Sequence, residues 1–281
     1  MTGREGGPGN LGFPRADPGE DRETDPPRSL ESAPMALDSG NYLNRHLPIA
    51  LILVGVGAGG ALWLAPQGSG GDTPVRVQDG ASVSVYRSMT EAVAGTPHWL
   101  HTVLELASEA SVALVALTLV AVWALAVRRR DAAVVAGTML IGAGTVAAYA
   151  LSEGLKLLVY QERPCRALAD AAAVAPCPEL GDWSFPSNHT TLAVGAAVGI
   201  ALLRPRLAAF VLPLGLAAAV LRVAVGVHYP HDVLAGSVLG ASFAVAALLM
   251  FAPLATRLVT PLLARLGGSP AVPDGGRPLS R

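Results

Sequence analysis

Residues 47–65 read LPIALILVGVGAGGALWLA, a run of nineteen residues without a charged side chain. A helix needs roughly 20 apolar residues to cross the hydrocarbon core of a bilayer, so this run predicts a membrane-spanning helix. Other apolar runs of similar length follow it, and the whole chain is 52% hydrophobic and 15% charged. Soluble domains carry about 25% charged residues. We therefore expect an all-α, polytopic membrane protein.

Six apolar segments predict six transmembrane helices packed in one bundle. They cover residues 47–65, 103–127, 132–155, 188–203, 207–227 and 232–254. The amphipathic stretch around Trp99, which precedes the second segment, is expected to lie at the membrane interface. Small residues four positions apart in GAAVG (195–199) and GSVLG (236–240) let helices pack closely. Such spacings also arise often by chance in a chain rich in Ala and Gly.

The chain is expected to consist of a membrane domain between two tails. Residues 1–45 are rich in Gly, Pro and charged residues. They cannot bury enough apolar surface to offset the entropy of ordering, which predicts a disordered cytoplasmic tail. They are not expected to be a signal peptide, because no apolar core follows the first residues. Residues 46–256 form the predicted six-helix domain, and residues 257–281 a second cytoplasmic tail.

The positions of the arginines predict the orientation of the chain. With the N-terminus in the cytoplasm, both tails, Arg128–Arg130, Arg204 and Arg206 fall on the cytoplasmic side, which accounts for 14 of the 20 Lys and Arg residues. The positive-inside rule favours this arrangement. Most of the remaining cations flank helices at the extracytoplasmic face, so they are expected to have a function there. The net charge of −1 gives no basic field that would attract nucleic acid.

Residues 222–236, RVAVGVHYPHDVLAG, place an arginine, two histidines and an aspartate beside apolar runs, where ionisable groups are costly. His189 opens the fourth segment and His228 closes the fifth, 39 residues later. This separation corresponds to one helix in, a short turn and one helix back, so both histidines return to the same face. Lys156 and Arg163 end the third segment at that face.

A cluster of cations and imidazoles at one face favours phosphate chemistry. The cations are Lys156, Arg163 and Arg222. Arg offers planar bidentate contact to a phosphate or diphosphate, and Lys offers a point charge. One histidine can attack phosphorus while the other protonates the leaving oxygen. Asp232, four residues after His228, can accept its ring N–H and set the tautomer. Ser187 is expected to cap the next helix, whose first N–H groups would face the anion.

Three motifs in this region resemble a known signature. KLLVYQERP (156–164) matches Lys-x6-Arg-Pro, PSNH (186–189) resembles Pro-Ser-Gly-His, and RVAVGVHYPHD (222–232) matches Arg-x5-His-x3-Asp. In this order and spacing they are similar to the type 2 phosphatidic acid phosphatase superfamily of membrane lipid phosphatases, which also includes the vanadium haloperoxidases. The resemblance extends over residues 47–255 and all six predicted spans.

The resemblance implies a metal-independent phosphatase without a cofactor that works through a phospho-histidine. It implies that His228 is the nucleophile, that Asp232 orients it, and that His189 protonates the leaving group. The implied phosphate-binding residues are Lys156, Arg163, Arg222, Ser187 and Asn188. Asn188 stands where the family usually has Gly, which would let the backbone approach the anion more freely. Leu221 replaces a common Ser, which removes one hydrogen bond.

Several neighbouring residues have more than one interpretation. His228 and Asp232 could form a structural pair at a helix start, and Lys156 could extend its ammonium group to the interface. Glu153, one turn before Lys156, either pairs with it or faces another helix. His231 fits no motif position and is interpreted as a surface residue or as a neighbour of the site.

Cys165 and Cys177 both fall in the predicted outer loop, residues 160–186. An oxidising compartment permits a disulfide between them, and free thiols are the alternative. A disulfide would stabilise the fold by roughly 3 kcal/mol in the chain-entropy model and would tether the loop over the site. The two cysteines lack the His spacing of a zinc site. Arg166, beside the first cysteine, is either a fourth phosphate contact or a solvated arginine.

The leading interpretation is an enzyme that hydrolyses lipid phosphates or diphosphates at the extracytoplasmic face. Undecaprenyl diphosphate, or another isoprenoid carrier diphosphate, is the first expected substrate, followed by phosphatidic acid and phosphatidylglycerol phosphate. A phosphotransferase would share the covalent intermediate, and the sequence does not separate it from a hydrolase. An anion transporter would need charges or broken helices at the bilayer midplane, whereas these residues gather at one face. The expected partners are the lipid substrate and the bilayer, with the oligomeric state left open.

Overall fold

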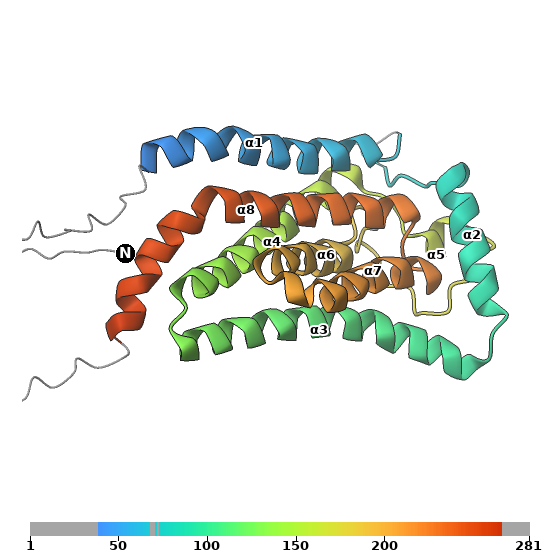
Figure 1. Ribbon diagram of the computed structural model, residues 1–281. Helices are drawn as coiled ribbons and strands as arrows, with labels where there is room; N and C mark the ends of the chain where they lie inside the picture. Colours follow the sequence, from blue (N-terminus) through green and yellow to red (C-terminus); the bar gives the residue numbers. More distant parts are fainter. Residues whose placement is uncertain (1–38, 68–70, 72, 266–281) are drawn as a thin grey trace, which may run out of the picture. The chain divides into compact units, whose positions relative to one another are not determined.

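The computed structural model describes residues 39–67, 71 and 73–265, and these residues fold into helices joined by loops, among them the long loop 168–187 between α5 and α6 (Figure 1). The helices are α1 (Ser39–Leu64), α2 (Ala81–Ala94), α3 (His98–Arg129), α4 (Ala132–Val159), α5 (Pro164–Ala167), α6 (Asn188–Leu203), the 3-10 helix η1 (Pro205–Leu207), α7 (Ala208–Ala224) and α8 (Pro230–Arg265). Within these ranges the β-structure is one isolated bridge, between Val75 and Gln161. The prediction of an all-α fold is confirmed.

Five helical segments of the described chain are long and apolar enough to cross a membrane. They are Asn44–Leu64, His98–Arg129, Ala132–Val159, Pro205–Ala224 and Pro230–Arg265. The segment predicted as the fourth span coincides with α6, which is apolar but has only 16 residues. The protein is therefore a multi-pass membrane protein whose described part has five helices long enough to span the membrane and one shorter apolar helix, so the predicted count of six spans is not confirmed.

The N-terminal boundary of the helical domain differs from the prediction. Helix α1 begins at Ser39, so residues 39–45, which were expected to be disordered, are helical. The Tyr42 hydroxyl donates a hydrogen bond of 2.9 Å to the carbonyl oxygen of Leu249 in α8, and the Tyr42 ring contacts the His46 ring. This contact with a distant helix stabilises the extra turns, and composition alone does not reveal it. Residues 1–38 of the predicted tail lie outside the described residues.

The C-terminal boundary also differs. Helix α8 continues to Arg265, beyond the predicted end of the membrane domain at residue 256. Val259 and Leu263 in this extension are buried in a cluster with Val134 and Val135 of α4. The second predicted tail is thus helical in its first part, and residues 266–281 lie outside the described residues.

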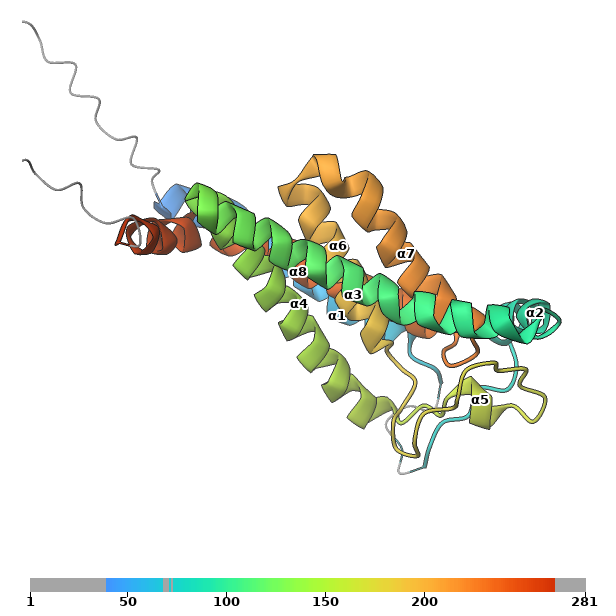
Figure 2. The same ribbon diagram turned by 90° about the horizontal axis from the view of Figure 1, so that it is seen from below.

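Helix α8 is the centre of the bundle. It packs against α1 on one side and against α4 and α6 on the other, while α7 packs against α6 and α3 (Figure 1). The stretch predicted to lie at the interface forms α2 and the first turns of α3, which include Trp99; residues 95–97 separate the two helices. In Figure 2, α2, α5 and the loop that leads into α6 gather at the same end of the bundle.

The two motifs of small residues lie where α6 crosses α8. A Cβ atom on Gly236 would lie 2.5 Å from the carbonyl oxygen of Ser187, and one on Gly240 would overlap the carbonyl oxygen of Thr191. A Cβ on Gly195 of α6 would in turn lie 2.9 Å from the Gly240 carbonyl oxygen. The absence of side chains at these positions allows the two backbones to touch.

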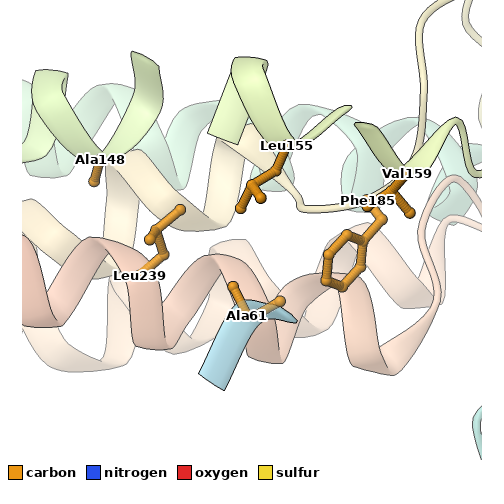
Figure 3. Close-up of a cluster of buried hydrophobic side chains, with 7 residues drawn as sticks. Ala61, Ala148, Leu155, Val159, Phe185 and Leu239 are labelled. Atoms are coloured by element: carbon orange, nitrogen blue, oxygen red, sulfur yellow. The ribbon is translucent and has the colours of Figure 1, made fainter. Parts of the chain in front are cut away.

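A buried apolar cluster fixes the start of α6 against its neighbours. It joins Ala61 of α1, Leu239 of α8 and the α4 residues Ala148, Leu155 and Val159 to Phe185, which lies just before α6 (Figure 3). Phe185 is fully buried in this cluster. Because burying a large aromatic side chain contributes strongly to packing, the cluster holds the segment before α6 beside the end of α4.

Candidate active site

A cavity of about 240 Å³ lies at the end of the bundle where α4 ends, α6 begins and α7 leads into α8. Six residues predicted for the site line it: Lys156, Arg163, Asn188, His189, Arg222 and His228. Other residues of its wall are Asp182, Val112, Tyr149 and Leu192. The structure thus brings three separate stretches of sequence together in one cavity.

The loops around the cavity are tied to one another by backbone hydrogen bonds. Tyr160 ends α4 in the left-handed region, at φ 48°, and its N–H bonds to the Lys156 carbonyl oxygen. The chain then passes Gln161, whose carbonyl oxygen accepts the N–H of Ser184 at 2.9 Å. The segment after α4 is therefore attached to the segment before α6, which places Arg163 opposite the start of α6.

His228 is buried between Arg163 and Asp232. Its Nε2 lies 3.0 Å from Arg163 Nη1, and its Nδ1 lies 3.4 Å from Asp232 Oδ2. A guanidinium can only donate hydrogen bonds, so Nε2 accepts and the ring proton lies on Nδ1, toward the carboxylate. Burial first, and then the positive charge of Arg163, lowers the pKa of His228 to about 3. The imidazole is therefore neutral near pH 7, with its lone pair on Nε2.

Asp232 is fully buried, and both of its carboxylate oxygens are hydrogen-bonded. Oδ2 accepts the backbone N–H of Tyr229 at 2.8 Å and the Ser184 hydroxyl at 2.5 Å. Oδ1 accepts the Gln161 side-chain amide at 3.0 Å and lies 3.2 Å from His231 Nε2. These bonds fix the carboxylate that faces His228, and they make His231 a neighbour of the site rather than a free surface residue.

Asp182 joins two of the cations. Its Oδ1 lies 2.9 Å from Arg163 Nη2 and 3.4 Å from Lys156 Nζ. Burial raises the pKa of the Asp182 carboxyl, but Arg163 first and Lys156 second outweigh it and lower the pKa below its ordinary value. Lys156 Nζ also lies 3.1 Å from Glu153, which settles the open interpretation of Glu153 in favour of a pair with Lys156.

The third cation, Arg222, is linked to His189 through a carboxylate from another helix. Glu109 of α3 places Oε1 2.9 Å from Arg222 Nη1 and Oε2 3.0 Å from His189 Nε2. Arg222 is largely buried, and its Nε has no hydrogen-bond partner among the described residues. A buried donor without a partner is costly, so this guanidinium can still bind an anion.

Comparisons with known proteins identify the family of this chain. The chain matches the model of the PAP2 superfamily over residues 133–255, a range that contains all three motifs. It is 34% identical over 165 residues to decaprenylphosphoryl-5-phosphoribose phosphatase of Mycobacterium tuberculosis, which covers 57% of this chain and 85% of that protein. The protein belongs to the PAP2 superfamily. The resemblance inferred from the motifs is confirmed.

Two further relatives of this PAP2 protein cover less of it or are more distant. Undecaprenyl-diphosphatase of Sulfolobus acidocaldarius is 37% identical over 99 residues, which is 34% of this chain and 46% of that protein. Among solved structures, LpxE of Aquifex aeolicus is 21% identical with a TM-score of 0.47, over 62% of this chain and 99% of that one.

The PAP2 motif that begins α6 differs from the expectation at Ser187. This residue occupies the N-cap position, but its side chain caps nothing; its Oγ instead accepts a hydrogen bond of 3.2 Å from Thr190. Its backbone N–H donates to the Asp232 carbonyl oxygen at 3.1 Å. Ser187 is fully buried and is not part of the cavity wall described above. The predicted cap is wrong because the hydroxyl is directed along the helix and into the protein.

Asn188, which stands at the usual Gly position of the PAP2 motif, connects α6 to α4. Its Oδ1 accepts the Ser152 hydroxyl at 2.8 Å, and its Nδ2 donates to Glu153 Oε1 at 2.5 Å. The side chain that replaces the glycine therefore fixes the helix start through contacts that glycine could not make.

The loop between the first two PAP2 motifs is closed by a disulfide. Cys165 and Cys177 are bonded, with their Cα atoms 6.0 Å apart. Arg166 donates hydrogen bonds to the carbonyl oxygens of Pro178 and Glu179. Arg166 thus binds the loop instead of lining the cavity.

Sequence reasoning missed four residues that contact the predicted site: Glu109, Gln161, Asp182 and Ser184. Glu109 carried a usable signal, because it is an acidic residue inside a predicted span, where ionisable groups usually have a function. The other three lie in loops whose conformation no periodic pattern specifies.

The buried, neutral His228 predicts that stability falls as the pH is lowered. In the unfolded chain this imidazole gains its proton near pH 6.5, but in the folded protein only near pH 3, as its pKa of about 3 requires. Between these values the unfolded chain binds more protons, so the free energy of unfolding rises with pH, by up to about 1.4 kcal/mol per pH unit. His228→Gln should therefore show a thermal midpoint that falls less steeply than wild type below pH 6.5. If the thermal midpoints of wild type and His228→Gln fell equally steeply with pH, His228 would not be the buried neutral group that causes the loss of stability.

Proposed function

We propose that this protein is an integral membrane phosphatase that hydrolyses a lipid phosphate or diphosphate through a phospho-histidine on His228. The observation that carries the proposal is the position of His228 Nε2. This nitrogen is unprotonated, lies 3.0 Å from an arginine and belongs to the wall of a cavity that holds two more cations and a second histidine. Such a constellation suits nucleophilic attack on a phosphorus that cations hold in place.

In the first proposed step, the lone pair of His228 Nε2 forms a bond to phosphorus, and the bond from phosphorus to the leaving oxygen breaks. His189 donates its proton to that oxygen. Asp232 accepts the Nδ1–H of His228 and stabilises the positive charge that the ring gains. The hydrogen bonds that Tyr229 and Ser184 donate to this carboxylate keep it in place.

In the second proposed step, His189, now neutral, accepts a proton from a water molecule whose oxygen attacks phosphorus. The bond between phosphorus and His228 breaks, and inorganic phosphate leaves. Lys156, Arg163 and Arg222 neutralise the phosphate oxygens in both steps, and the free Nε of Arg222 supplies a donor. The chain's own cations therefore provide the charge stabilisation, and we propose a metal-independent reaction.

We infer the substrate class from the apolar residues that line part of the cavity. Val112, Tyr149 and Leu192 come from α3, α4 and α6, and the side chains of all three are partly exposed. An amphiphile could hold its phosphate among the cations and its tail along this apolar wall. An isoprenoid carrier phosphate or diphosphate is the first choice, supported by two relatives named for decaprenyl and undecaprenyl substrates. Phosphatidic acid and phosphatidylglycerol phosphate come next.

We further propose that the cavity faces the extracytoplasmic side and that both termini are cytoplasmic. Arg128–Arg130 end α3, and Arg204 and Arg206 follow α6, so these arginines lie at the helix ends opposite to the cavity. The positive-inside rule places such a cluster in the cytoplasm.

A phosphate-release assay tests the proposed function. The protein, purified in detergent with a chelator, should release phosphate from undecaprenyl diphosphate, phosphatidic acid or phosphatidylglycerol phosphate, and vanadate should inhibit it. Vanadate adopts the five-coordinate geometry of the attacked phosphorus. An added alcohol acceptor distinguishes phosphoryl transfer from hydrolysis. Release that requires an added metal ion, or no release from any of these lipids by folded protein, would refute the proposal.

A further inference from the structure

We propose that Glu109 is a positioning residue for His189: its carboxylate fixes the imidazole so that Nδ1 exchanges the proton with the leaving oxygen and with water. The inference rests on the proposed function, because it assigns a partner to the acid of that reaction. Glu109 is not part of any of the three sequence motifs, and it precedes the first of them by 47 residues (156 − 109).

The Glu109 carboxylate connects two charged partners. Glu109 contacts His189 with one oxygen at 3.0 Å and Arg222 with the other at 2.9 Å. A single residue of α3 thereby connects the helix that carries the acid, α6, to the helix that carries a phosphate-binding cation, α7. Because carboxylates held by two charged partners are restricted in orientation, the His189 ring is held at a fixed angle to Arg222.

The contact with Glu109 also determines the tautomer of the His189 ring. An ionised carboxylate can only accept hydrogen bonds, so His189 must use its Nε2–H to contact Glu109. The second ring nitrogen, Nδ1, has no hydrogen-bond partner among the residues that the structure describes. In the imidazolium form Nδ1 carries the proton that the leaving oxygen needs, and in the neutral form it is the base that water needs. Glu109 therefore assigns both proton transfers to one nitrogen.

Glu109 lies within an apolar helix. Helix α3 is apolar along most of its length and is one of the candidate membrane spans. An acidic residue in such a helix is costly and is usually paired with a functional partner. Glu105 lies one turn before Glu109 and has no hydrogen bond or ion pair among the described residues; it acts on Arg222 only through its charge. It provides a matched control with the same charge and the same helix.

The activity test compares two substrates that differ in leaving group. Glu109→Leu should lower kcat/KM, which reports the first step, for an alkyl phosphate or lipid monophosphate by about 10²-fold, the lower range for a lost general acid. The same variant should lose less than about 3-fold in kcat/KM with p-nitrophenyl phosphate, whose leaving group departs without protonation. Glu109→Gln, which retains an acceptor oxygen, should be intermediate. Glu105→Leu should resemble wild type with both substrates.

A second measurement does not depend on activity. The measurement is ring-nitrogen NMR of protein labelled at its six histidines. The signals of His189 are assigned as those that disappear in His189→Asn. They should show the Nε2–H tautomer in wild type and a mixture of tautomers in Glu109→Leu. Unchanged tautomers, equal losses with both substrates, or an equal effect of Glu105→Leu would each overturn the role of Glu109. Failure of wild type to hydrolyse any phosphate, with the tautomer as expected, would instead refute the proposed function and leave the positioning contact in place.

Discussion

His228→Ala should reduce the rate of phosphate release by about 10⁴-fold or more, the range observed when an enzyme loses its nucleophile. The reason is geometric: Nε2 of His228 is the nitrogen held unprotonated against Arg163 in the cavity. Without it, no bond from this position to phosphorus can form. Steady-state release from the best lipid substrate measures the loss. Wild type, but not the variant, should also carry an acid-labile phosphoryl label when quenched during turnover.

The matched control for this variant is His98→Ala, since His98 begins α3 and is not among the residues that line the cavity. It should retain wild-type activity. Both proteins should still be folded at the assay temperature, as judged by their thermal unfolding curves, which separates lost chemistry from lost folding. A His228→Ala protein that is folded and keeps a tenth of its activity would exclude the phospho-histidine mechanism.

Gly240→Leu should destabilise the protein by about 3 kcal/mol, at the upper end for overpacked positions. A Cβ at this position already overlaps the carbonyl oxygen of Thr191, so a leucine forces α8 away from α6. The flexible end of a side chain could move aside, but a helix backbone cannot. Because the separation shifts the start of α6, activity should fall together with the thermal midpoint measured in detergent.

Gly142→Leu is the control for this packing change. Gly142 lies on α4, and a Cβ there would meet nothing within 4 Å. Leu has a higher helix propensity than Gly, so this variant should be as stable as wild type or more stable by about 0.5–1 kcal/mol. The close approach of α6 and α8 would not be a determinant of stability if the two leucine variants unfolded at the same temperature.

The sequence was sufficient to predict the helical fold and the convergence of the cationic and histidine residues. Helix length determines which face each end of a span reaches, so His189 and His228 had to return to one side. The bounds of α6 also agree with the predicted segment, residues 188–203, but whether this helix crosses the membrane could not be predicted. Its apolar run ends at Leu203, before Arg204 and the 3-10 turn, and the pattern does not say whether 16 residues suffice to cross.

The carboxylates of the site were harder to predict, for two different reasons. Asp182 reaches Arg163 because its segment is tied to the segment after α4 by the bond from the Ser184 N–H to the Gln161 carbonyl oxygen, and loop conformation depends on such contacts distant in sequence. Glu109 reaches His189 because of the rotation of α3 about its own axis. That rotation depends on packing against α6 and α7, which an apolar helix without a clear polar face does not specify.

The shortness of α6 has a consequence for the depth of the reaction. A helix of 16 residues is about 24 Å long, less than the roughly 30 Å of hydrocarbon in a typical bilayer. Its first residue, Asn188, is bonded to Ser152, which lies about 10 Å along the axis of α4 before that helix ends at Val159. Because α4 has 28 residues and is about 42 Å long, longer than the hydrocarbon is thick, we expect the start of α6 to lie near the hydrocarbon boundary rather than out in the water. Hydrophobic mismatch thus becomes part of substrate access, because a thinner leaflet around the protein brings its headgroups closer to this depth.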